Sequence, residues 1–466
     1  IRLSLVGSEM CIRDSNDNIK KIIPKISGGG QEFGIRGGTE NLIGITAFGE
    51  CAKLIDKIYS ESIEKLSANS KVKKAFKYII DIEEKTMKNL IELTEIEAPP
   101  FKEEKRAKEF AERLKLAGIE NVWIDSIGNV IGLLKGTVGN KNIAIDAHMD
   151  TVFPEGTDVK VKIKNDTLYA PGVGDDTRGL AMILTIAETI KKNGIQPINN
   201  ILFIGTVGEE GLGNLRGVRY LFENNNPKID SWIAIDGGSI GRVNNQALGS
   251  YRYEVVFDGP GGHSWGAFGL VNPHHALGYG IKDFIEKADK YTSSGPRTSY
   301  NVGIISGGTS INSIPFKSSM QIDIRSVEPY RLDAMEEILF NSMQSALKDQ
   351  NEMKRSGPDL KLTINKIGNR PSGKVDESVP LIQRTIAATQ HMGVEPRLTI
   401  GSTNSNIPIS LGVPSVTIGR GGDGAGAHSL DEWWLNKDGY KSIQLALLIL
   451  LSETGINSLD LKNFFD

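Results

Sequence analysis

Residues 142–150, NIAIDAHMD, read as a buried strand that ends in a histidine and an acid. Two further short apolar runs, 200–207 and 232–235, have the same character. An apolar period of 3.6 residues over 180–190 predicts a helix between the first two runs. The pattern returns near the end of the chain, with a strand at 415–418. Strands that alternate with helices indicate an α/β sheet with helices on both faces.

The sequence between the two parts of this α/β domain has a different pattern. Strand-like runs and helical periods follow one another in the order β-α-β-β-α-β, which is that of a ferredoxin-like α+β domain. The predicted parts are a leader at 1–15, a remnant and junction at 16–75, a larger domain at 76–249 and 367–455, an inserted domain at 250–366, and a tail at 456–466.

Composition excludes several classes of protein. The 466 residues include 54 basic and 57 acidic side chains, and the net charge of −3 argues against a nucleic-acid or membrane-surface binder. The longest apolar stretch is much shorter than the roughly 20 residues of a membrane span. Only Cys11 and Cys51 occur, so we expect a reducing, cytoplasmic location and no disulfide framework.

Histidine and acidic side chains gather where the predicted strands end. Asp150 shares a strand face with His148, so it can accept a hydrogen bond from the imidazole and direct the other ring nitrogen to a metal. Each acidic segment by itself is also compatible with a helix cap or a solvated turn. Together, the nitrogen and oxygen donors predict an open site for two divalent metal ions, if one carboxylate is shared. The five donors are His148, Asp175, Glu210, Asp236 and His428.

The same segments carry a resemblance to a known family. They are HMDTV at 148–152, GDD at 174–176, EEG at 209–211, DGG at 236–238 and GAHS at 426–429, with GGHS at 261–264 and GGTSINSIP at 307–315 in the insert. Residues 76–455 resemble the zinc aminopeptidase and aminoacylase family of peptidase T, carboxypeptidase G and acetylornithine deacetylase. The resemblance implies a zinc-exopeptidase-type mixed sheet and an inserted lid and dimerisation domain.

The resemblance also implies the roles of the site residues. Asp175 would bridge two ions, His148 and Asp236 would complete one of them, and Glu210 and His428 the other. Glu209 would be the general base that activates a water shared by the ions, and Asp150 would orient His148. Zinc is the first choice of metal, and cobalt or manganese suit the same donors.

The lid adds three further candidates. His263 would reach into the partner's site of a homodimer and polarise the scissile carbonyl, whereas Asn312 and Arg325 would bind the substrate backbone or a carboxylate. At Asn404 relatives often carry Asp, and this departure bears on recognition of a substrate amine.

The expected function is therefore a dimetal exopeptidase that hydrolyses amide bonds of short peptides. Asp instead of Glu at position 236 favours a di- or tripeptide aminopeptidase of the peptidase T type. The alternatives are an N-acyl-amino-acid deacylase or a carboxypeptidase of the same family, and a non-catalytic binding protein that keeps only the fold. The expected partners are a small peptide or acyl-amino-acid substrate and a second copy of the chain.

The first 57 residues have another character. Residues 1–15 have no clear period and read as an artefact-like leader. The run GGGQE at 28–32 and the run RGGTEN at 36–41 resemble an internal fragment of cysteine desulfurases. Such an enzyme needs a pyridoxal-phosphate lysine and a complete cofactor domain, for which the preceding segment is too short. We therefore expect a fusion or assembly remnant without activity of its own, and the alternative is a natural N-terminal extension.

Overall fold

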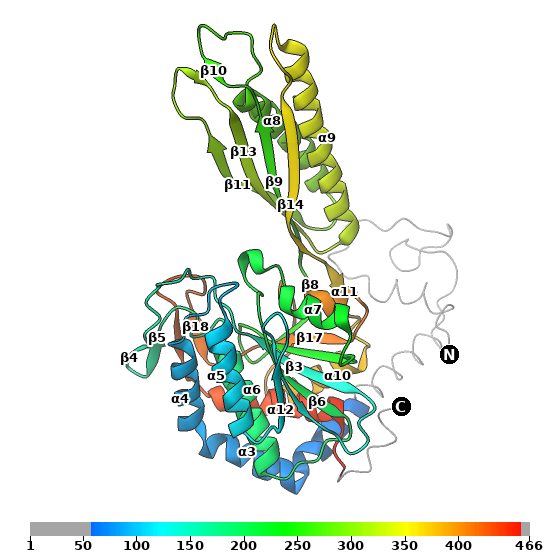
Figure 1. The fold of residues 1–466 in the computed structure, drawn as a ribbon. Helices are drawn as coiled ribbons and strands as arrows, with labels where there is room; N and C mark the ends of the chain where they lie inside the picture. Colours follow the sequence, from blue (N-terminus) through cyan, green and yellow to red (C-terminus); the bar gives the residue numbers. More distant parts are fainter. Residues whose placement is uncertain (1–56, 458–466) are drawn as a thin grey trace, which may run out of the picture. The chain divides into compact units, whose positions relative to one another are not determined.

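The computed structural model describes residues 57–457 (Figure 1). The chain divides into two compact units, Ile1–Glu61 and Ser62–Asp466, and the description that follows concerns the second. This unit begins before the predicted domain start at residue 76, because Ile63 and Val72 are already buried. The predictions for the leader and for the cysteine desulfurase fragment up to residue 56 lie outside the described residues.

A nine-stranded mixed sheet forms the centre of the larger domain, with the strand order β1-β2-β6-β3-β7-β17-β8-β15 and β16 paired with β8. The neighbours β6, β3, β7 and β17 run parallel, whereas β1, β2 and β15 pair antiparallel with their neighbours. The strands are β1 (Asn121–Ile124), β2 (Val130–Leu134), β3 (Asn142–His148), β6 (Asn200–Thr206), β7 (Ser231–Ile235), β8 (Arg242–Ala247), β15 (Gly373–Lys374), β16 (Arg397–Gly401) and β17 (Ser415–Ile418).

Helices cover both faces of this sheet, as Figure 1 shows for α7 and α11 on one side and α6 and α12 on the other. Strands β3, β6 and β7 are apolar and buried over almost their whole length, which requires cover on both faces. The predicted mixed α/β fold is therefore confirmed. The helices are α3 (Ser70–Asp81), α4 (Glu83–Thr94), α5 (Glu104–Leu116), α6 (Thr177–Lys192), α7 (Arg216–Asn224), α10 (Pro380–His391), α11 (Asn406–Ser410) and α12 (Gly439–Thr454).

The inserted domain, called the lid below, is a four-stranded antiparallel sheet with two helices. Its sheet order is β11-β13-β9-β14, and apolar side chains of the sheet pack against α8 and α9 in one core. In chain order the elements are β9 (Gly249–Asp258), α8 (Pro273–Thr292), β11 (Thr298–Gly307), β13 (Lys317–Ser326), α9 (Pro329–Met353) and β14 (Lys361–Arg370). This is the predicted β-α-β-β-α-β order, and β9 and β14 extend past the predicted limits at 250 and 366.

Two small sheets were not predicted from the sequence. One pairs β10 (Gly262–His263) with β12 (Ser313–Ile314) in the lid. The other has the order β18-β19-β5-β4 and consists of β4 (Lys162–Lys164), β5 (Thr167–Tyr169), β18 (Asp423–Ala425) and β19 (Trp433–Leu435). It brings the loop that carries His428 next to the loop that carries Asp175. Within residues 57–457, no helix is both long and apolar enough to span a membrane.

Candidate active site

Four of the candidate residues lie at one edge of the central sheet because three parallel neighbours end there. His148 is the last residue of β3, Glu209 and Glu210 follow β6, and Asp236 follows β7. Since β6, β3 and β7 are adjacent and parallel, their carboxyl ends meet at the same edge. These residues were therefore predictable from strand ends alone.

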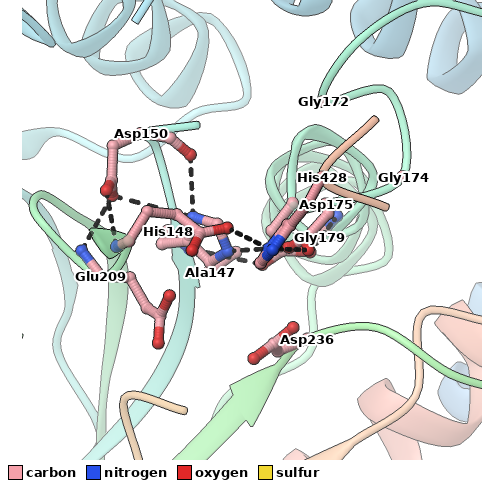
Figure 2. Close-up of polar contacts among 12 residues, drawn as sticks. Ala147, His148, Asp150, Gly172, Gly174, Asp175, Gly179, Glu209, Asp236 and His428 are labelled. Carbon is pink, nitrogen blue, oxygen red and sulfur yellow. Dashed lines mark hydrogen bonds and ion pairs between the residues drawn. The ribbon is translucent and has the colours of Figure 1, made fainter. Parts of the chain in front are cut away.

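Two further candidates, Asp175 and His428, reach the same edge from loops. Asp175 immediately precedes the Asp176 cap of α6, and α6 packs on β3. Its carboxylate lies 3.1 Å from His148 Nε2 and 3.3 Å from His428 Nε2 (Figure 2). His428 Nε2 also lies 2.9 Å from Glu210 Oε1. Asp175 thus lies between the two histidines.

The side chains form three groups that could each hold a metal ion, with all ligand atoms of a group within 4.8 Å of one another. Asp175 belongs to two of these groups. One consists of His148, Asp175 and Asp236, and the other of Asp175, Glu210 and His428. The donors are carboxylate oxygens and imidazole nitrogens, which suit zinc, cobalt or manganese. The residues present therefore fit two ions with a shared carboxylate.

The electrostatics of the cluster also favour a bound cation. Burial raises the pKa of Glu209 to about 8, although Arg370 opposes this shift. Burial and the nearby charge of Asp175 raise the pKa of Asp236. Burial also opposes ionisation of Asp175, but hydrogen bonds with His148 and His428 outweigh it and hold the pKa of Asp175 below its usual range. Crowded buried carboxylates are costly without positive charge beside them.

Residues 144–452 match the family described as Peptidase family M20/M25/M40. The chain belongs to this family. Carboxypeptidase G2 of Pseudomonas sp. (strain RS-16) is 25% identical over 316 residues, which are 65% of this chain and 71% of that protein. The aminopeptidase PepT from Bacillus cereus has a similar structure, with a TM-score of 0.64, 21% identity and coverage of 79% of this chain and 98% of that chain.

A third similar structure is that of the Bacillus subtilis YXEP protein, described as a dinuclear metal-binding peptidase from the M20 family. Its TM-score is 0.58 at 16% identity, and the match covers 80% of this chain and 99% of that chain. A peptidase family consists of hydrolases that act on peptides. The predicted family and enzyme class, a metallopeptidase or related amidohydrolase, are therefore confirmed.

Asp150 differs from the expectation in this M20 protein, because its main chain and not its carboxylate accepts the hydrogen bond of His148. The His148 Nδ1–H group donates to the main-chain carbonyl of Asp150 at 2.9 Å, whereas the Asp150 carboxylate is 3.7 Å from that nitrogen. The carboxylate instead accepts the main-chain N–H groups of Glu209 and Glu210 at 3.0 and 2.8 Å. The Asp150 carboxylate therefore fixes the turn that carries Glu209 and Glu210. The Asp150 carbonyl fixes the His148 ring so that its Nε2 atom faces Asp175.

Arg370, the last residue of β14, is a site residue that the sequence analysis missed. Its Nη1 atom donates to Glu209 Oε1 at 2.9 Å and to Ser402 Oγ at 3.1 Å, and its Nη2 atom donates to the Glu209 main-chain carbonyl. The guanidinium is buried, so it holds the Glu209 carboxylate in one orientation. A single arginine before Pro371 has no periodicity or spacing that marks it as part of a site.

The three lid candidates make their contacts within the lid, among residues 57–457. His263 lies on β10, where its Nδ1 atom accepts the N–H groups of Trp265 and Gly266 at 3.2 and 3.3 Å. The main-chain carbonyl of Asn312 accepts the N–H of Ser264 at 2.9 Å, which keeps Asn312 close to His263. Arg325 pairs with Asp323 at 2.6 Å on the lid sheet. The structure therefore does not bring these three residues into the metal groups.

Asn404 is buried and is not available to a substrate amine. Its Nδ2 atom donates to Asp146 Oδ2 at 2.8 Å and to Thr206 Oγ1 at 2.7 Å. Burial raises the pKa of Asp146 to about 7, and the hydrogen bonds from Asn404 and Thr206 oppose that shift. The amide thus supports β3 and β6 beneath the site, and the expected effect on amine recognition finds no support in these contacts.

Proposed function

We propose that this M20 protein is a dimetal exopeptidase that hydrolyses short peptides, acting as a di- or tripeptide aminopeptidase. The observation that supports the proposal is the pair of three-residue groups that share Asp175, with the buried Glu209 beside them. The structural similarity to an aminopeptidase from Bacillus cereus agrees with it. Asp236, in place of a glutamate, favours the same class of substrate.

In this proposal two divalent cations, zinc by first choice, are bound by the two groups. His148, Asp175 and Asp236 would hold one ion, and Asp175, Glu210 and His428 the other. Bound ions of this kind polarise a carbonyl oxygen and lower the pKa of water. The chain itself supplies the remaining groups that the reaction needs.

Glu209 would be the group that transfers a proton during the reaction. Its carboxylate would accept a proton from the attacking water and then donate it to the leaving amine. Burial raises the pKa of Glu209 above that of an exposed glutamate, which makes its carboxylate a stronger base toward the attacking water. Arg370 fixes the orientation of this carboxylate through its hydrogen bond to Oε1.

His263 would stabilise the negative charge that develops on the carbonyl oxygen. Since its Nδ1 atom accepts two N–H groups, the proton of the neutral ring is on Nε2, which is then a donor. We propose that it serves the site of a partner in a homodimer that forms through the lid. The edge strand β11 exposes Ile304 and Ile305 to solvent, which supports a contact there. Asn312 and Arg325 remain candidates for substrate binding.

The alternative is an N-acyl-amino-acid deacylase or a carboxypeptidase with the same site, and the similarity to carboxypeptidase G2 favours the latter. A cytoplasmic location stays a prediction.

The first test combines metal analysis with a substrate panel. We expect two ions per chain, loss of activity with a chelator, and release of the amino-terminal residue from free di- and tripeptides. Hydrolysis restricted to N-acyl amino acids would instead identify a deacylase, and release of the carboxyl-terminal residue a carboxypeptidase. Fewer than one ion per chain together with no hydrolysis would favour the non-catalytic binding protein.

A second test asks whether two chains share a site. Mixing His263→Ala chains with Glu209→Gln chains is expected to restore about a quarter of the wild-type activity, because half of a random mixture is mixed dimers with one complete site each. Either variant mixed with the double variant Glu209→Gln/His263→Ala is the control and should show no rescue. Failure to recover activity at any ratio would contradict a shared site.

A further inference from the structure

Glu432 is a buried acid close to the cluster that does not belong to any of the three metal groups. It lies four residues after His428, at the end of the same loop. One carboxylate oxygen accepts the main-chain N–H of Gly172 at 2.6 Å. The other accepts the N–H groups of Gly174 and Asp175 at 2.8 and 2.9 Å. Its side chain therefore binds the backbone of the loop that presents Asp175.

The main chain of Glu432 joins the same two loops. Its carbonyl accepts the N–H of Ala170 at 3.1 Å, and the next residues form β19, which pairs with β5. The approach is close, since a Cβ atom at Gly174 would lie only 2.9 Å from Glu432 Oε1 and 2.6 Å from Arg420 Nη2. A side chain at 174 would therefore require the Glu432 carboxylate and the Arg420 guanidinium to shift.

His428 has little other support. Its side chain is 55% exposed, in contrast to the buried His148, and its φ of 65° is unusual for a residue other than glycine. A side chain with few packing contacts takes its position from its backbone. The distances from His428 to Asp175 and Glu210 therefore depend on how firmly the loop of Glu432 is attached.

We propose that Glu432 is a positioning residue that holds Asp175 and His428 at ligand distance from each other. It thereby sets the affinity of the ion site formed by Asp175, Glu210 and His428. The inference rests on the dimetal site of the proposed function. It adds a residue that does not bind an ion itself but fixes the backbone of residues that do.

Two substitutions remove these hydrogen bonds in steps. Glu432→Gln keeps an oxygen that can accept from Gly174 and Asp175, but its amide nitrogen would face the N–H of Gly172, and two donors do not pair. Glu432→Ala leaves all three buried N–H groups without this acceptor. The effect on metal affinity should therefore increase from Gln to Ala.

The experiment is a titration of the metal-free full-length protein with Co²⁺, followed by the visible absorption of the bound ion and by stoichiometry. A His428→Ala variant identifies which binding phase belongs to the His428 site. We expect that phase to weaken by about 10-fold in Glu432→Gln and about 100-fold in Glu432→Ala, the range found when a partner that orients metal ligands is removed.

The control is Glu188→Gln, which removes a buried carboxylate distant from the cluster that accepts from Tyr78 and Lys85. It should lower thermal stability and leave both binding phases unchanged. If Glu432→Ala does not fold, Glu432→Gln decides alone. Wild-type affinity in a folded Glu432 variant would overturn the inference but leave the dimetal site intact. A wild-type chain that binds fewer than two ions would overturn the dimetal site and the inference with it.

Discussion

Replacing Glu209 by Gln is expected to lower kcat by about 10²–10⁴-fold, which is the usual contribution of a positioned general acid–base group. Gln has nearly the shape of Glu but cannot accept a proton from water, so the substitution removes the chemistry and spares the packing. The hydrogen bond from Arg370 Nη1 can be kept by the amide oxygen. Metal content should stay at two ions per chain, because Glu209 belongs to neither of the groups that share Asp175, although it forms the third group with His148 and Glu210.

The measurement is steady-state kinetics on a tripeptide together with metal analysis of the same preparation. Glu188→Gln is a suitable control, since it also changes a buried glutamate to its amide and should leave kcat unchanged. A metal-loaded Glu209→Gln enzyme with full activity would exclude Glu209 as the base. Loss of both metal and activity would show instead that Glu209 acts as a ligand.

The second large effect is expected for Asp175→Asn. Asp175 is the residue common to the two proposed ion sites, and its carboxylate faces His148 on one side and His428 on the other. An amide has no charge and offers only one oxygen to two ions. We expect metal content to fall below one ion per chain, with a loss of affinity larger than the about 10–100-fold that follows removal of a partner of a ligand.

Equilibrium dialysis with Zn²⁺ and activity at saturating metal measure this effect. Asp423→Asn is the control, because Asp423 is an exposed acid of β18 whose side chain forms an ion pair only with Lys437 among the described residues. Two ions retained at wild-type affinity in Asp175→Asn would rule out a shared carboxylate. Retention of one ion would leave Asp175 as a ligand of a single site.

Residues close in sequence to a strand end were the predictable part of the site. His148, Glu210 and Asp236 follow apolar runs, and a short apolar run between turns marks a buried strand wherever its partners lie. The ends of parallel strands share one edge, so a common location followed without knowledge of the neighbours. The order of elements in the lid was predictable for the same reason, because the spacing of apolar residues in each segment indicates whether that segment is a helix or a strand.

Contacts between distant segments had no local signal. Glu432 binds the N–H of Asp175 across 257 residues, and Arg370 reaches Glu209 across 161. A buried acid beside two tryptophans, or an arginine before a proline, has no pattern that states which backbone it will bind.

Hydrophobic periodicity is a property of each segment alone, and it was therefore enough to predict the α/β sheet, the inserted domain and the edge where donors gather. The tertiary structure was needed to show which group of Asp150 meets His148 and which residue attaches the loop of His428. These depend on distances between atoms that folding brings together from separate parts of the chain, and such distances are not encoded in the order of neighbouring residues.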